Sequence, residues 1–262
     1  MSYIIICTVA LLVSGFTLFS GFGLGTLLMP AFALFFPVEV AVAATAIVHL
    51  ANNIFKVVLV GRQADFKVVA KFALPAAVAA MLGALILNLL ATVPPMAEYT
   101  LAGRTCVITP VKLVIATLIL GFAVLEVAPG FEKVSFDPKY IPVGGLLSGF
   151  FGGLSGHQGA LRTAFMIRLG LPKEVFIGSM VVSAVAVDVS RLLIYGSTFF
   201  ERDFAILRQG GGIGLVVAGS LAAFLGAFIG SRLLKKVTMR GIQTAVGIML
   251  FLLSIALGAG LI

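Results

Sequence analysis

Two groups of polar side chains interrupt apolar stretches of the sequence, each at spacings that share one helix face. The first group lies within residues 40–60 and consists of His49, Asn52, Asn53 and Lys56. The second lies within residues 175–197 and consists of Asp188, Arg191 and Tyr195. Residues three, four and seven apart are neighbours on a helix surface. We predict that the two groups face each other or a shared cavity, where ionisable groups line or gate the path of a charged substrate.

Three alternatives remain open for the ionisable members of these groups. Lys56 and Arg191 each precede the glycine that ends their stretch by five residues, so both side chains can extend to the water interface instead. Asp188 and Arg191, three residues apart, can simply neutralise each other. His49 can exchange a proton near neutral pH, which suits proton coupling, or can remain a neutral hydrogen-bonding residue.

Two glycine-rich sequences, GFGLG at 21–25 and SGHQG at 155–159, each precede a short apolar stretch. A helix that starts after such a break presents free N–H groups and the positive end of its dipole, and both attract anions. We predict that these breaks bind an anionic substrate through Gly23, Gly25, Thr26, Gly156, His157, Gln158 and Gly159. Close helix packing is the alternative for the glycines.

Arg162 follows the second glycine-rich sequence by less than two helical turns. An arginine buried in a membrane is costly and marks a pathway or an ion pair. Its planar guanidinium suits a sulfonate, sulfite or carboxylate group. We predict that Arg162 and Asn53 belong to the substrate-binding set. An Arg162–Asp188 salt bridge, or extension of Arg162 to the interface, is the alternative.

Composition indicates the elements that must position these residues. The chain has 262 residues, of which 61% are hydrophobic and 11% charged, and the first charged residue is Glu39. A soluble domain is roughly 25% charged, and a membrane-spanning helix needs about 20 apolar residues. We predict an all-α polytopic membrane protein with roughly seven to nine segments. This excludes a cytosolic enzyme, a nucleic-acid-binding protein and a secreted disulfide-rich domain, and no motif indicates a metal or cofactor.

Uncharged runs predict eight segments, at 1–38, 40–60, 72–93, 107–125, 140–170, 175–197, 209–231 and 241–262. Residues 35–61 align with residues 170–196 at an offset of 135, which pairs Pro37 with Pro172, Glu39 with Glu174, Asn53 with Asp188, Lys56 with Arg191, and Gly61 with Gly196. Upstream, Ser14-Gly15-Phe16 aligns with Ser148-Gly149-Phe150. We predict a duplication: repeat 1 at 1–128, a connector at 129–139 and repeat 2 at 140–262.

The loop charges favour inverted repeats. Eight simple crossings put seven Lys and Arg residues on one side and eight on the other. If 1–38 and 140–170 are instead hairpins that enter and leave on one side, each half crosses three times. Eleven basic residues then lie inside, and four lie outside (Arg104, Lys112, Arg202 and Arg208). The positive-inside rule prefers this arrangement, in which the glycine breaks meet near the bilayer midplane.

Three stretches resemble the TauE/SafE family of sulfite exporters, also called the toluene sulfonate uptake permeases. They are SGFGLGTLLMP at 20–30, FFGGLSGHQGALRTAFMIRLGLPKEVFI at 150–177 and VDVSRLLIYG at 187–196. The resemblance covers essentially the whole chain, with motif positions Gly21, Gly23, Gly25, Pro30, Gly152, Gly153, Gly156 and Gly159. The first half lacks counterparts of His157 and Arg162, so the second half is expected to supply most of the affinity.

The resemblance implies secondary transport of sulfite, organosulfonates or related anions across the bacterial cytoplasmic membrane. We expect export by alternating access, a coupling proton or ion, no cofactor, no nucleic-acid partner and a possible homodimer. An anion channel remains an alternative, because glycine breaks and a basic pore suit one too. A membrane-embedded enzyme is a weaker alternative, because it requires clustered acidic or histidine side chains.

Overall fold

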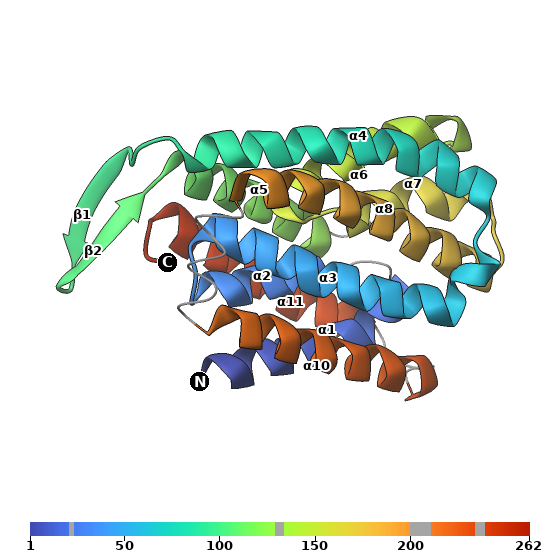
Figure 1. Cartoon of the computed structure of the whole chain (residues 1–262), viewed down its shortest axis with the longest axis horizontal. Helices are drawn as coiled ribbons and strands as arrows, with labels where there is room; N and C mark the ends of the chain where they lie inside the picture. Colours follow the sequence, from blue (N-terminus) through green and yellow to red (C-terminus); the bar gives the residue numbers. More distant parts are fainter. Residues whose placement is uncertain (21–23, 129–133, 200–210, 234–238) are drawn as a thin grey trace.

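The computed structural model describes residues 1–20, 24–128, 134–199, 211–233 and 239–262. Within them the chain forms a bundle of helices that run roughly along one direction, with a two-stranded hairpin projecting from one end (Figure 1). Both termini lie at the hairpin end of the bundle, and the connection between α3 (Val38–Val60) and α4 (Phe66–Ala91) lies at the opposite end (Figure 1). The expected all-α polytopic membrane class is confirmed.

In its described residues, the first half of the chain contains five α-helices, one short 3-10 helix and the hairpin. Their order is α1 Ser2–Ser20, α2 Leu24–Ala33, α3 Val38–Val60, η1 Gly61–Gln63, α4 Phe66–Ala91, β1 Ala97–Leu101, β2 Arg104–Ile108 and α5 Pro110–Val127. The second half, in its described residues, contains η3 Pro138–Tyr140, α6 Ile141–Ser155, α7 Gly159–Met166, η4 Ile167–Leu169, α8 Lys173–Phe199, α10 Gly212–Leu233 and α11 Met239–Gly258.

Each of the eight predicted apolar segments contains a helix. Among the described residues, four stretches are long and apolar enough to cross a membrane: Val38–Gln63, Phe66–Ala91, Lys173–Ser197 and Gly212–Gly230. Shorter apolar stretches of the described residues are Ser2–Gly15, Leu24–Ala33, Pro110–Leu125 and Gly247–Gly258. The second segment predicted to be broken is divided, since α6 ends at Ser155 before α7 begins at Gly159; in the first, the described helices are Ser2–Ser20 and Leu24–Ala33. Residues 21–23, with Gly21 and Gly23, lie outside the described residues.

Local sequence signals set several helix boundaries. The Asp65 carboxylate accepts hydrogen bonds from the N–H groups of Lys67 and Val68, which caps the start of α4. Thr109 caps α5, and Pro110 occupies its first position, where no N–H donor is needed. Gly156 ends α6 in the left-handed region at φ +85°, which glycine adopts without strain.

Small residues allow two helix pairs to approach closely. On α6, a Cβ at Gly145, Gly149 or Gly153 would collide with a backbone carbonyl of α4. On α10, a Cβ at Gly226 or Gly230 would collide with backbone atoms of α1 in the same way. Glycines four residues apart therefore let both helix pairs pack backbone against backbone, as small residues do between membrane helices. The same kind of contact recurs in both halves, since α6 packs on α4 as α1 packs on α10.

Helices α3 and α8 pack side by side in opposite directions. A Cβ at Gly178, near the start of α8, would lie 2.8 Å from the Val60 carbonyl oxygen at the end of α3. Midway along both helices, Asn53 of α3 contacts Asp188 of α8. The two polar groups found in the sequence therefore face each other across this helix pair.

The hairpin is an element that the uncharged runs did not predict. β1 and β2 pair antiparallel from Ala97 opposite Ile108 to Leu101 opposite Arg104. Ala102 and Gly103 form the turn with φ of 50° and 77°, the left-handed pair that a two-residue hairpin loop requires. The segment expected at 107–125 consequently begins as a strand and continues as α5.

Candidate functional site

The two helix breaks meet inside the bundle. A Cβ at Gly25, in the first turn of α2, would lie 2.9 Å from the Gly156 carbonyl oxygen and 3.8 Å from His49 Cδ2. A Cβ at Gly156 would in turn lie 3.3 Å from Arg191 Nη1. Glycine is needed at both positions, because the backbone of one half approaches the backbone and polar side chains of the other. Thr26, the next residue of α2, is also buried.

Asp188 is the centre of the polar site. Its Oδ2 atom lies 2.6 Å from His49 Nδ1 and accepts a hydrogen bond from Asn53 Nδ2 at 3.0 Å. Its Oδ1 atom accepts from Gln158 Nε2 at 3.0 Å, and from Arg191 Nε at 3.1 Å and Nη2 at 2.7 Å. Four side chains from three helices or their caps therefore converge on a single carboxylate that is fully buried.

The second helix break extends this network toward α7. Gln158 precedes the first residue of α7, and its Oε1 atom accepts a hydrogen bond from Arg162 Nη1 at 2.9 Å. Ser148 Oγ donates to the Gln158 carbonyl at 2.8 Å, which holds the break against α6. Gln158 thus lies between Arg162 and Asp188 and links the two through hydrogen bonds.

Arg191 also fixes the end of α6. Its Nη1 atom donates to the Gly152 carbonyl at 3.0 Å, and the Tyr195 hydroxyl donates to the Gly153 carbonyl. These bonds satisfy carbonyls at the end of α6. Arg191 therefore pairs with Asp188, as one alternative proposed, and at the same time holds the helix break. The alternative that Arg191 extends to the interface is wrong, since its side chain is fully buried.

Lys56 lies in a second branch of the polar site. The Asn52 amide, oriented to satisfy its neighbours, accepts from Lys56 Nζ at 3.2 Å and donates to the Ala223 carbonyl of α10 at 3.2 Å. Ser14 of α1 lies 3.1 Å from the same amide. Lys56 is buried, so its extension to the interface is also wrong. Asn52 faces α1 and α10, whereas His49 and Asn53 face α8.

His157 lies in the second break, close to but apart from the Asp188 cluster. Its Nδ1 atom lies 3.1 Å from both the carbonyl and the hydroxyl oxygen of Ser155, and its ring stacks on Phe122 at a centroid distance of 5.2 Å. Its Nε2 atom is buried and has no hydrogen-bond partner. A buried nitrogen without a partner costs free energy unless a ligand or water fills its place. His157 therefore has one free position for a substrate oxygen.

The structure thus brings together most of the predicted residues. The Asp188 cluster contains His49, Asn53, Gln158, Arg162 and Arg191; the second branch contains Asn52 and Lys56; and the break itself contains Gly25, Gly156, His157 and Gly159. Gly23 lies outside the described residues. Ser14 and Ser148 were not selected from the sequence as site residues. Both serines form hydrogen bonds to the network. The sequence signal that could have identified them is their alignment with each other in the duplication.

Charge is unevenly distributed in this buried region. Lys56, Arg162 and Arg191 are all buried. Among the residues that the structure describes, Asp188 is the only buried carboxylate. With His49 neutral, three positive charges therefore face one negative charge. A buried charge without a counter-charge is strongly unfavourable, so the site as a whole favours an added anion.

A comparison with protein families matches residues 4–257 to the family described as sulfite exporter TauE/SafE. The chain belongs to this family. No curated protein and no solved structure matches the chain. The TauE/SafE family is a family of membrane transporters, so this multi-pass TauE/SafE protein is assigned to membrane transport of sulfite or a related anion, as the sequence predicted.

The described family-motif glycines of this TauE/SafE protein have separable structural roles. Gly152 and Gly153 provide the carbonyls that Arg191 and Tyr195 bind. Gly156 and Gly25 form the contact between the two breaks. Gly159 is the first residue of α7. The motif therefore corresponds to the buried polar site and its supports.

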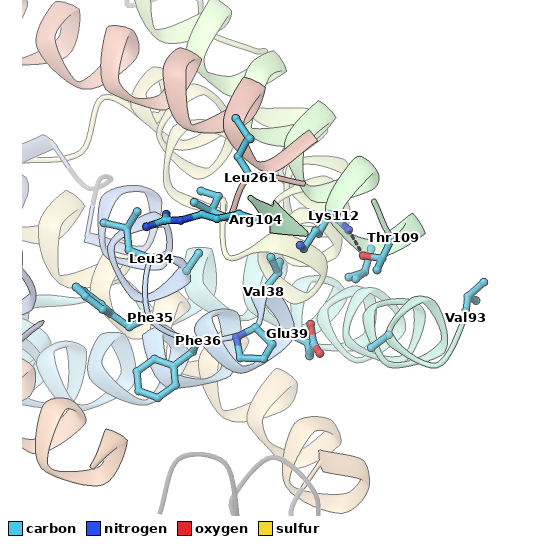
Figure 2. Close-up of a pocket in the computed structure, with 15 residues that line it drawn as sticks. Leu34, Phe35, Phe36, Val38, Glu39, Val93, Arg104, Thr109, Lys112 and Leu261 are labelled. Atoms are coloured by element: carbon cyan, nitrogen blue, oxygen red, sulfur yellow. Dashed lines mark hydrogen bonds between the residues drawn. The ribbon is translucent and has the colours of Figure 1, made fainter. Parts of the chain in front are cut away.

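A separate pocket of about 530 Å³ opens at the hairpin end of the TauE/SafE fold (Figure 2). It lies between the end of α2, the start of α3, β2, the start of α5 and the last residues of the chain. Arg104 and Lys112 bring basic groups to it, Glu39 brings a carboxylate, and Leu34 and Phe36 bring apolar surface. Because α2 runs from Gly25 to this pocket, a single ten-residue helix connects the pocket to the buried site.

Proposed function

We propose that this protein is a secondary transporter that exports sulfite, an organosulfonate or a related small anion by alternating access across the bacterial cytoplasmic membrane. The surplus of buried positive charge around Asp188 carries the proposal. Two positive charges in excess, held in a low-dielectric region, are neutralised by an anion and disfavour a cation. Family membership supports the same class of substrate.

The substrate anion is proposed to bind at the meeting of the helix breaks. Arg162 supplies the guanidinium and His157 supplies the unpartnered Nε2 atom. Gln158 and Asn53 add amide groups, and the backbone near Gly25, Thr26, Gly156 and Gly159 adds N–H groups at helix starts. Gly23 is included in the proposed binding set on the basis of the sequence alone. His49, Asn52, Lys56, Asp188 and Arg191 are proposed to line or gate the pathway.

Two observations support inverted repeats around this site. Asn53 and Asp188 are equivalent in the proposed duplication, and they hydrogen-bond to each other at 3.0 Å. Residues that are related by a pseudo-two-fold axis contact each other only close to that axis. Their helices, α3 and α8, run in opposite directions, as inverted repeats require. We propose that repeats 1–128 and 140–262 rock around this axis to expose the site to each side in turn.

The proposed orientation puts the hairpin end outside. The pocket that contains Arg104 and Lys112 is then an external vestibule, and Arg62, Lys67 and Lys71 face the cytoplasm, in agreement with the positive-inside rule. A proton or ion is expected to be coupled to the movement of the anion. A homodimer is proposed as the oligomeric state.

Flux into proteoliposomes tests the proposed function. Purified protein should transport sulfite or a short-chain sulfonate with saturable kinetics, and Arg162→Ala should abolish transport while leaving expression intact. Arg168→Ala is the matched control, because Arg168 lies six residues later, is exposed, and should be dispensable. Full transport by Arg162→Ala would refute the role of Arg162. Non-saturating flux with single-channel conductance in planar bilayers would favour a channel instead.

A further inference from the structure

His49 is the most accessible member of the buried polar cluster. It retains 9% exposure, whereas Asp188, Asn52 and Arg191 have none. Within the His49–Asp188 pair the side-chain exposure is 11% for the imidazole and 0% for the carboxylate. The Cδ2 edge of the ring, which carries Nε2, faces Gly25 at the contact between the two helix breaks. His49 is therefore the point where a proton can enter a network that is otherwise closed.

The hydrogen bonds indicate which nitrogen is available to that proton. Asp188 is paired with Arg191 and accepts from several donors, so it is ionised. The 2.6 Å contact then places a hydrogen on His49 Nδ1, directed at Asp188 Oδ2. In this tautomer, Nε2 carries the lone pair. Protonation at Nε2 leaves the bond to Asp188 intact and converts it into an ion pair.

We propose that His49 takes up one proton each time the site binds a substrate anion, so that this protein moves the proton and the anion together. This inference rests on the proposed transport function and names its coupling ion and the residue that carries it. The imidazole is joined directly to the carboxylate around which the anion site is built, and its open edge faces the proposed substrate position.

The surrounding charges explain why the two events are linked. Asp188 and Arg191 of α8 and Arg162 of α7 act electrostatically on His49. Lys56 lies two turns further along α3, and neither α2 nor the described side chains of α10 contain a titratable group. A proton on His49 raises the buried surplus from two positive charges to three, which is unfavourable in the empty site. An anion beside Arg162 compensates this charge.

The effect is reciprocal. A bound anion raises the proton affinity of His49, and a proton on His49 raises the affinity of the site for the anion by the same factor. The proton and the anion then travel in the same direction. Net direction follows the sum of the two gradients, so export occurs where the outward anion gradient exceeds the inward proton gradient.

Ethanesulfonate is a suitable probe, because it stays ionised over the whole range in which histidine titrates. Its affinity for the purified full-length protein should be measured calorimetrically from about pH 5.5 to 8.5, the range around a histidine. We expect the affinity to fall as pH rises, approaching about tenfold per pH unit at the alkaline end, the slope for one linked proton. In weakly buffered solution, binding should remove about one proton per anion from the medium.

His49→Gln should bind ethanesulfonate without this pH dependence and without proton uptake. His157→Gln is the matched control, because it removes the other histidine: its affinity should fall, but its pH slope should remain. Binding by the unmodified protein without proton uptake would overturn the inference, as would an unchanged slope in His49→Gln. Binding that is independent of pH leaves the proposed transport function standing. Failure to bind or transport any sulfonate or sulfite overturns that function itself.

Discussion

Asp188→Asn tests the buried network most directly. The two carboxylate oxygens of Asp188 accept from donors on His49, Asn53, Gln158 and Arg191. Asparagine keeps the shape of the side chain but offers one acceptor oxygen and an NH₂ group that faces other donors. It also removes the only buried carboxylate of the described residues. The substitution therefore removes the counter-charge of the basic side chains and leaves some hydrogen-bond donors unpaired.

The expected loss of stability is large. Removal of one partner of a buried ion pair costs about 3–5 kcal/mol. For a chain of this size, 1 kcal/mol corresponds to about 2–4 °C in melting temperature, so the melting temperature should fall by roughly 6–20 °C. Glu98→Gln removes an exposed carboxylate on β1 and should shift it by less than about 2 °C.

The chain itself supplies a reporter for this measurement. It contains no tryptophan but has two free cysteines, half-buried Cys7 and buried Cys106. A fluorogenic thiol reagent therefore follows unfolding in detergent. A melting temperature for Asp188→Asn within 2 °C of the unmodified protein would refute this account. Asp188→Asn/Arg191→Gln should be more stable than the sum of the single changes predicts, because it removes both charges of the pair; strict additivity would count against the pair.

Three further predictions concern packing, support and access. In thermal unfolding, Gly149→Ala should destabilise the protein by about 1–3 kcal/mol, because the new Cβ would collide with the Ala76 carbonyl. Gly121→Ala is the control: a Cβ at Gly121 meets open space, so the change should be neutral or stabilising by up to about 1 kcal/mol. Tyr195→Phe should cost about 0.5–1.5 kcal/mol in the same assay, because the Gly153 carbonyl loses its donor. Arg104→Gln should slow the initial anion flux at low ionic strength and leave thermal stability unchanged, since Arg104 is exposed and lines only the outer pocket. Equal slowing at high salt would contradict electrostatic attraction of the anion by Arg104.

Helical spacing and the internal offset predicted that the two polar groups face each other or a shared cavity, but not which side chains form hydrogen bonds. The spacing assigned Asn53 and Asp188 to polar faces, and the offset made them equivalent. The structure brings them into contact. Side-chain chemistry at the second glycine break also pointed correctly to Gln158 and Arg162 as members of one polar site.

Other features depend on information that spacing does not contain. Asn52 follows the same helix as Asn53, but adjacent residues project about 100° apart, so Asn52 faces α1 and α10 instead of α8. A lysine stem reaches inward or outward equally well, and only the packing of neighbouring helices directs Lys56 inward. The hairpin was not predicted, because a search for uncharged runs detects neither the alternation of side chains along a strand nor the Ala102-Gly103 turn.

The contact between Asn53 and Asp188 also constrains how such a site can arise. A position that faces its own equivalent across a two-fold axis carries the same residue twice in a symmetric dimer of half-length chains. Two aspartates there would repel, and two asparagines would leave Arg191 without its carboxylate. In the proposed duplication, the unequal pair is available only when the two halves differ in sequence, which one polypeptide allows and two identical half-length chains do not.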